Sequence, residues 1–326
     1  MIRLFSPAVR PQNVFSCHSF LASIMCVLTA VLLYGCEKPV VSGFGDDEET
    51  EAVVDGVRVT FDATQYVQEA FGAGVMELSN ASQGSPRRAM RNVKEVCSRL
   101  TFAVFHSGEK MKVMHQLASD DDFGRIVLVL PEGTYQVVAV AHSGNGSATV
   151  SSPTEISFPN NKVTDTFLAC EDVTVAEDSK SFSLQLERCV AMFRLVVADE
   201  IPEEVVQMKF YYTGGSSTLD AVSGVGCKKS RQTEFRDVTS EMHSTGQTFE
   251  VFSFPRVDSD ALEMQVTAFD ASGNIVKERE FASVSIRKNY ITAYEGSFFA
   301  GISGEDPGEF GLFVNDEWAD VMRSQF

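Results

Sequence analysis

The histidines and clustered aspartates are the side chains of this sequence best suited to binding a metal or transferring protons. His106, His115 and His142 lie in or beside predicted strands and could meet in space, but their spacing matches no helical metal-binding motif. The run Asp120–Asp122 lacks the spaced acidic residues and glycine of a calcium loop. The sequence also has no G-x-S-x-G elbow and no Walker loop. We therefore expect no metal, no cofactor, no catalytic residue and no enzymatic activity.

Cys36 offers a different chemistry, because it follows an export signal. Residues 1–35 contain Arg3 and Arg10 as their only charged residues, and an apolar run ends at Leu33. This pattern is typical of a secretory signal, and the run is shorter than the roughly 20 residues of a membrane-spanning helix. The ending Leu-Tyr-Gly before Cys36 resembles the lipobox of bacterial lipoproteins. We expect a signal peptide over residues 1–35 and an acylated Cys36; an ordinary signal peptide is the alternative.

The charge of the chain limits its partners. The formal net charge is −18, which argues against binding nucleic acid or anionic lipid through the protein surface. An acidic run, residues 46–49, follows Cys36 closely. Because like charges repel and stay solvated, residues 36–50 are predicted to form a flexible acidic tether.

Four cysteines remain beyond the signal and the lipid site, namely Cys97, Cys170, Cys189 and Cys227. An exported protein can form disulfides, and four cysteines allow three complete pairings among which the sequence does not choose. Buried free thiols are the alternative. No C-x-x-C motif is present, so a zinc or redox site has no support.

Short apolar alternations dominate the rest of the chain and predict an all-β protein. The expected strands are residues 57–61, 100–105, 111–116, 125–130, 135–141, 156–158, 164–174 and 181–186 in a first series, and 192–197, 206–212, 249–254, 263–269, 275–281 and 290–294 in a second. Two series of short strands are typical of β-sandwiches. We predict an N-terminal β-sandwich over residues 51–187, a C-terminal β-sandwich over 188–300 and a tail over 301–326.

Several blocks of the sequence resemble the FimB/Mfa-type fimbrial anchor family. They are Arg99-Leu-Thr-Phe-Ala-Val-Phe105, Asp122-Phe-Gly124, Leu130-Pro-Glu-Gly-Thr-Tyr135, Val138-Ala-Val-Ala-His142-Ser143, Arg287-Lys-Asn289-Tyr-Ile-Thr292 and Gly296-Ser-Phe-Phe299. The resemblance implies two tandem transthyretin-like (immunoglobulin-like) β-sandwiches and a role in fimbriae that assemble by β-strand exchange. It also implies that other fimbrial subunits are partners, and that an anchor keeps its lipid and stays at the outer membrane.

The C-terminal tail contains a candidate donor strand for such an exchange. Phe310, Leu312 and Val314 alternate with other residues, and Trp318, the only tryptophan, follows them. The alternative is that the tail packs on its own C-terminal sandwich.

A protease could change the role of the protein within the same family. Arg87, Arg88 and Arg91 lie in a segment that we read as a loop between strands, where an arginine-specific protease could cut. Cleavage would remove the lipid tether and make a shaft or tip subunit. The expected function is a lipid-anchored fimbrial anchor or accessory subunit; the rivals are this matured pilin and a surface lipoprotein that binds glycan or another ligand.

Overall fold

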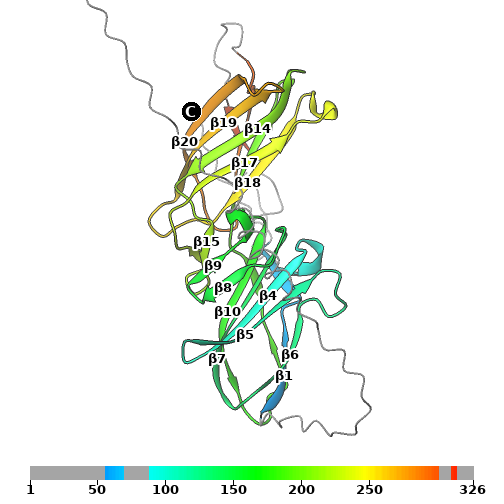
Figure 1. The fold of residues 1–326 in the computed structure, drawn as a ribbon, viewed down its shortest axis with the longest axis vertical. Coiled ribbons are helices and arrows are strands. Elements are labelled where there is room, and N and C mark those ends of the chain that lie inside the picture. Colours follow the sequence, from blue (N-terminus) through cyan, green and yellow to red (C-terminus); the bar gives the residue numbers. More distant parts are fainter. Residues whose placement is uncertain (1–55, 70–87, 301–309, 314–326) are drawn as a thin grey trace, which may run out of the picture. The chain divides into compact units, whose positions relative to one another are not determined.

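Nearly all regular structure in the protein is β-strand. The computed structural model describes residues 56–69, 88–300 and 310–313 (Figure 1). In these residues the only helical elements are three 3-10 turns, η1 (Val93–Glu95), η2 (Pro159–Asn161) and η3 (Ser240–Met242). No described helix is long and apolar enough to cross a membrane. The prediction of an all-β protein with two tandem β-sandwiches is confirmed.

A seven-stranded sheet and a three-stranded sheet form the first sandwich. The larger sheet has the order β3-β2-β12-β10-β7-β4-β5 and the smaller has the order β11-β1-β6. Their strands are β1 (Val57–Asp62), β2 (Gln65–Glu69), β3 (Arg88–Asn92), β4 (Arg99–His106), β5 (Glu109–Leu117), β6 (Arg125–Leu130), β7 (Gly133–His142), β10 (Thr166–Val175), β11 (Ser181–Ser183) and β12 (Leu186–Arg188). Phe61 of β1 packs on Phe102 of β4, with ring centroids 5.0 Å apart, inside one hydrophobic cluster that joins the two sheets.

The seven-stranded sheet is buried on both faces. Phe102 and Val104 of β4 point into the first sandwich, whereas Ala103 and Phe105 belong to a second cluster on the opposite face. A four-stranded sheet of order β16-β15-β9-β8 contributes to that cluster. Its strands are β8 (Thr149–Ser152), β9 (Glu155–Ser157), β15 (Thr218–Asp220) and β16 (Val225–Gly226). A strand that is buried on both faces does not need to alternate apolar and polar residues. This explains the unbroken apolar run in β4.

Two four-stranded sheets form the second sandwich. One has the order β18-β13-β21-β22 and the other β17-β14-β19-β20. Their strands are β13 (Ala191–Val197), β14 (Val205–Thr213), β17 (Arg231–Asp237), β18 (Gln247–Ser253), β19 (Ala261–Asp270), β20 (Ile275–Ser285), β21 (Ile291–Gly296) and β22 (Phe310–Phe313). Phe193, Phe210 and Phe249 lie in the cluster between the sheets.

Contacts cross the predicted boundary between residues 187 and 188. Strand β15 pairs with β9, so the insertion after β14 completes a sheet begun in the first half. Arg188 donates to both carboxylate oxygens of Asp165, at 2.7 and 2.9 Å, and to Asn289 Oδ1 at 3.3 Å. The two predicted domains therefore share one sheet and one hydrophobic cluster.

His142 is a buried titratable group at the end of β7. Its side chain is fully buried, and its Nδ1 accepts a hydrogen bond from the Gly144 N–H at 3.0 Å. Nε2 has no hydrogen-bond partner, and the ring packs edge-on against Phe158 with centroids 5.2 Å apart. Burial, with a smaller contribution from Arg99, lowers the pKa of His142 to about 4 from its usual 6.5.

We predict that His142 makes the protein less stable in acid. Between pH 6.5 and 4 the unfolded chain binds a proton at this residue and the folded protein does not, so the free energy of unfolding falls as the pH decreases. The two pKa values correspond to a loss of about 3 kcal/mol between pH 7 and pH 4. Urea unfolding at both pH values should show this loss reduced in His142→Asn and retained in His106→Asn, whose histidine is exposed. Equal pH dependence in His142→Asn and the wild type would contradict the assignment.

Candidate functional site

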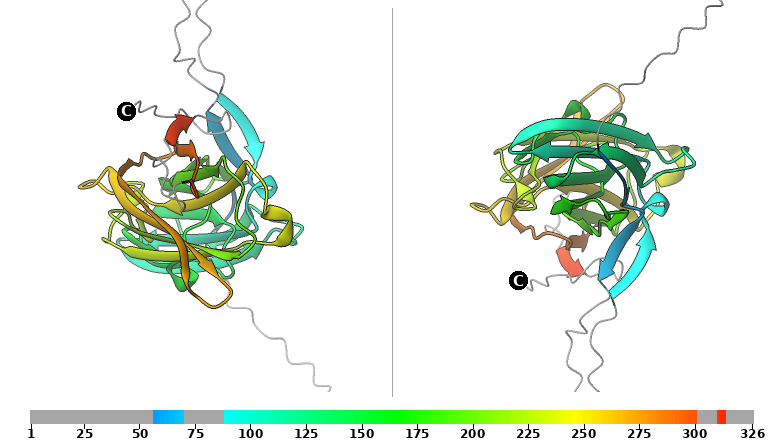
Figure 2. Two further views of the ribbon diagram at one scale, coloured as in Figure 1. Left: turned by 90° about the horizontal axis from the view of Figure 1, so that it is seen from above. Right: turned by 90° about the horizontal axis from the view of Figure 1, so that it is seen from below.

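The C-terminal strand β22 lies at the edge of its own chain's second sandwich. It pairs antiparallel with β21, with Phe310 opposite Gly296 and Leu312 opposite Tyr294. Figure 2 shows β22 (red) alongside β21. Of the candidate donor residues, Phe310 and Leu312 thus belong to this strand, and Val314 and Trp318 lie outside the described residues. The tail strand is paired within its own chain, at a position where only one side of it is hydrogen-bonded to a described strand.

Charged groups hold residues 297–300, which lie between β21 and the tail. The carboxylate of Asp199 accepts hydrogen bonds from the backbone N–H groups of Phe298, Phe299 and Ala300, at 2.8, 2.7 and 2.9 Å. The guanidinium of Arg279, on β20, donates to the carbonyls of Ser297 and Phe298 at 3.0 and 2.7 Å, and to that of Ala300 at 3.0 Å. Hydrogen bonds to ionised groups are the strong ones. We call Asp199, Arg279 and residues 297–300 the exit clamp, because they fix the point from which the tail departs.

Side chains from the facing sheet close the outer edge of β18. That edge lacks a neighbouring strand among the described residues, but Arg236 donates to the carbonyl of Glu250 at 2.7 Å and the Tyr212 hydroxyl donates to that of Phe252 at 3.0 Å. Glu234 accepts from both donors, at 2.8 and 2.9 Å. Burial, and then the Glu234 charge, raise the pKa of Tyr212 well above its usual range, so it remains a donor. Capped carbonyls are unavailable to an added strand.

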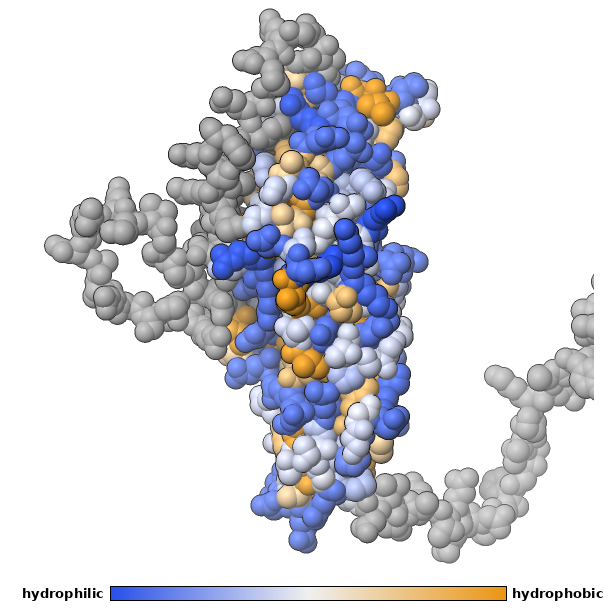
Figure 3. Space-filling view, turned by 90° about the vertical axis from the view of Figure 1, so that its left-hand side faces the viewer, coloured by the Kyte–Doolittle hydropathy of each residue, from blue (hydrophilic) through white to orange (hydrophobic). Residues whose placement is uncertain are grey.

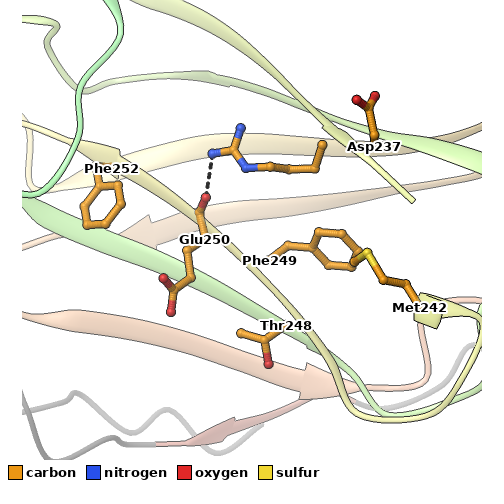
Figure 4. A pocket seen from close by; sticks show the side chains of 7 residues that line it. Asp237, Met242, Thr248, Phe249, Glu250 and Phe252 are labelled. Carbon is orange, nitrogen blue, oxygen red and sulfur yellow. Dashed lines mark hydrogen bonds between the residues drawn. The ribbon is translucent and has the colours of Figure 1, made fainter. Parts of the chain in front are cut away.

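A pocket of about 400 Å³ opens beside this closed edge (Figure 4). It is lined by Arg236, Asp237, Met242, Thr248, Phe249, Glu250 and Phe252. Its charged groups already have partners: Arg194 donates to the Glu250 carboxylate at 2.8 Å, and Gln207 donates to Asp237 at 3.0 Å. A ligand would have to compete with these interactions, so the pocket offers no ready polar site.

The four candidate disulfide cysteines are free thiols in the structure. Cys97 and Cys189 are buried, Cys170 is partly buried and Cys227 is exposed. Burial raises the pKa of the Cys170 thiol to about 11 and raises that of Cys97 and Cys189 as well. A raised pKa keeps a thiol protonated and unreactive, so these side chains behave as small core residues.

The candidate cleavage residues do not all lie in a loop. Arg88 and Arg91 belong to strand β3, which pairs with β2, and reading this part of the segment as a loop was wrong. The reading failed because β3 is an edge strand with polar residues, which lacks the apolar alternation used to recognise strands. Arg91 is exposed. Arg87 and Cys36 lie outside the described residues.

Of the three candidate histidines, His106 and His115 each have a polar atom within hydrogen-bonding distance of the ring, whereas Nε2 of the buried His142 has no partner. His106 Nδ1 lies 3.0 Å from the carbonyl of Thr134, and His115 Nδ1 lies 3.0 Å from the hydroxyl of Thr101. Asp120 accepts the backbone N–H of Leu117 at 2.8 Å, as expected in a tight turn. Within the described residues no group of three or more His, Cys, Asp or Glu side chains is placed to hold a metal ion.

A comparison with models of known protein families assigns the chain to one of them. The sequence model described as "Family of unknown function (DUF6562)" matches residues 73–320, which is most of the chain. The protein belongs to the DUF6562 family. The matched range contains strands of both sandwiches and the clamp that precedes the tail. A search of curated proteins found no match.

Several solved structures resemble this DUF6562 protein at low sequence identity. They include the fimbrial anchor protein Mfa2 from Porphyromonas gingivalis (10% identity, TM-score 0.42, 80% of this chain and 98% of that chain), a fimbrial assembly protein from Parabacteroides distasonis (13%, 0.42, 79% and 96%) and a candidate adhesin from Bacteroides thetaiotaomicron (12%, 0.44, 82% and 98%). A member of the fimbrial anchor family named from the sequence is therefore among these structures.

We predict that the exit clamp contributes strongly to stability. Asp199→Ala leaves three backbone N–H groups without their charged acceptor and should lower the free energy of unfolding by about 2–3 kcal/mol. Asp237→Ala removes an exposed carboxylate and should change it by less than about 0.5 kcal/mol. Urea unfolding gives both values, and hydrogen exchange should be faster at the amides of residues 298–300 in the first variant alone. Equal stability of the two variants would contradict the clamp.

Proposed function

We propose that this protein is a lipid-anchored subunit of surface fimbriae at the outer membrane, and that it acts as an anchor or accessory subunit. The observation that carries the proposal is β22, a short strand that follows the exit clamp and, among the described strands, pairs on one side only. The sequence supports the rest: the export signal and Cys36 provide a lipid tether, and several blocks resemble fimbrial anchors. The negative charge makes nucleic acid an unsuitable partner.

Strand exchange is chemically simple at this position. When β22 leaves β21, both strands expose backbone N–H and C=O groups, which a strand from another subunit can satisfy in the same geometry. One set of backbone hydrogen bonds replaces another, so the exchange changes the partner with little change in the number of bonds. The exit clamp stays in place, since it holds residues 297–300 rather than β22.

The second candidate function is the matured pilin, a shaft or tip subunit made by proteolytic cleavage near Arg91. Such a cleavage would remove strands from the first sandwich. A cut after Arg91 would separate β1, β2 and all of β3 except Asn92 from the rest of the chain. Strand β1 lies between β11 and β6 and contributes the fully buried Val59 and Phe61 to the core. Its loss would open a groove with unpaired edges on two sides, which a strand from a neighbouring subunit would fit. The ligand-binding alternative has less support, because the charged groups of the pocket are already paired.

Mass spectrometry of the N-terminus separates these functions. Fimbriae are sheared from the native bacterium and the protein is recovered from both the fimbrial and the membrane fractions. An acylated Cys36 in membranes, together with co-purifying pilin, supports the anchor. An N-terminus after Arg87, Arg88 or Arg91 in the sheared fraction supports the matured pilin. A lipidated protein that never accompanies fimbriae would contradict both.

We expect Cys36→Ala to move the protein from the membrane fraction to the soluble fraction, because acylation needs the thiol and no acyl chain would then hold the protein on the bilayer. Fimbriae should be released into the medium at the same time. Cys26→Ala, within the apolar run of the signal, is the matched control and should leave both fractions as in the wild type. Immunoblots of the two fractions provide the measurement.

Locking β22 in place should block assembly. Glu295 and Gly311 are directly opposite in the β21–β22 register, so a Glu295→Cys/Gly311→Cys pair places two thiols within reach of a disulfide. With Cys227→Ser as background, oxidation should prevent association with fimbriae and reduction should restore it. The control pair Gln265→Cys/Glu280→Cys joins β19 to β20 and should have no effect. Normal assembly with the lock closed would show that β22 does not exchange.

A further inference from the structure

In the part of the chain that the structure describes, large exposed hydrophobic side chains are few and scattered. The face in Figure 3 shows hydrophobic residues singly or in small groups among hydrophilic ones. Val127 and Val129, which are 40% and 42% exposed, differ from this pattern because they stand two residues apart on one strand, β6. Isolated exposed apolar residues need no explanation, but a pair on one edge strand does.

Strand β6 has an uncharged edge beyond Arg125, whose carbonyl accepts a hydrogen bond from Gln116 Nε2 at 3.1 Å. It pairs with β1 and with no other strand among the described residues. Its sequence, RIVLVL, has Arg125 at its first position as the only charged residue. The other long edges are protected: β5 and β20 carry several lysines and glutamates, β17 and β3 carry arginines, and side chains cap the carbonyls of β18. Charged side chains are the usual protection of edge strands, and β6 lacks it.

The two faces of β6 fit different surroundings. Ile126, Leu128 and Leu130 point into the core of the first sandwich and are at most 9% exposed. Val127 and Val129 point outward, beside Thr60 and Arg58 of β1. A strand added at the open edge would therefore extend the core on one face and cover two valines on the other.

We propose that β6 pairs antiparallel with β6 of a second copy of this chain, around a two-fold axis at Leu128. In this register the two Leu128 side chains are opposite each other, and Val127 is opposite Val129 of the partner subunit. An isologous contact of this kind needs a self-complementary surface. Strand β6 provides one, because all directly opposed residues are apolar on both faces. The resulting six-stranded sheet has the order β11-β1-β6, β6-β1-β11.

The charges around β6 favour a second copy. Arg125 lies beyond the apolar pairs, and its guanidinium is 3.9 Å from Asp62 of its own chain. Arg58 is next to Val129 and is followed across the interface by two uncharged side chains. The two Arg58 residues are therefore three strand spacings apart across the sheet and two residues apart along it, roughly 16 Å in all, which exceeds the screening length at 0.1 M salt. No like charges oppose each other, although each copy has a net charge of −18. Added salt should thus favour the dimer.

Cysteine cross-linking of the full-length protein in native membranes tests the interface. With Cys227→Ser as background, Val127→Cys/Val129→Cys should give a disulfide-linked homodimer on mild oxidation, with residue 127 joined to residue 129 of the partner. The control Val222→Cys/Val257→Cys uses more exposed valines and should give at least tenfold less dimer. Reactive thiols without a dimer would overturn the proposal. Cross-links to a different protein would assign β6 to that partner instead.

A second measurement removes the dependence on disulfide chemistry. We expect the wild-type, detergent-extracted protein to sediment as a dimer. Val127→Lys/Val129→Lys places like charges in direct opposition across the interface and should abolish this dimer in sedimentation velocity, whereas Val222→Lys/Val257→Lys should not. Both changes are on exposed positions, and unfolding curves verify that the variants fold. These readouts concern one protein, so they stay informative even if the fimbrial function fails.

Discussion

Both faces of the seven-stranded sheet have to be kept from water, and most of the architecture follows from this constraint. One face is covered by the three-stranded sheet, through Phe61 and its neighbours. The other face needs a second cover, which is built from β8 and β9 of the first half and from β15 and β16 of the second. Burial of apolar area gives the main driving force for such packing. The second sandwich is thus tied to the first by the strands that shield it.

The sequence predicted the strands whose hydrophobic pattern reflects burial. It failed for strands that are polar or that depend on pairing with distant parts of the chain. The alternation of β6 and the apolar runs of β4 and β7 were recognised directly. Strand β17 was missed, because its inward position holds Glu234 where an apolar residue is expected. Strand β3 was missed because it is polar. The pairing of β15 with β9 lies beyond sequence reasoning, since a three-residue strand gains its stability from partners far along the chain.

The sequence predicted only part of the candidate site. The alternation in the tail indicated a strand, and β22 is one. Asp199 and Arg279 were missed, because a lone aspartate and an arginine 80 residues apart have no motif that links them to a backbone segment. A polar residue at an inward strand position, as with Glu234, is the signal that could have indicated the capped edge of β18. Fimbrial assembly remains our proposal for what these edges do.

The exit clamp also determines where mechanical tension enters the protein. Once β22 has left β21, as strand exchange requires, a pull on the tail reaches residues 297–300 first, and from there it passes through Asp199, which follows β13, and through Arg279 on β20. These two strands belong to opposite sheets of the second sandwich. The load is therefore divided between both sheets at once, and β21 is not peeled from its neighbour one hydrogen bond at a time. Under our proposal, tension on such a subunit would therefore be spread over the whole second sandwich and not concentrated on a single pair of strands.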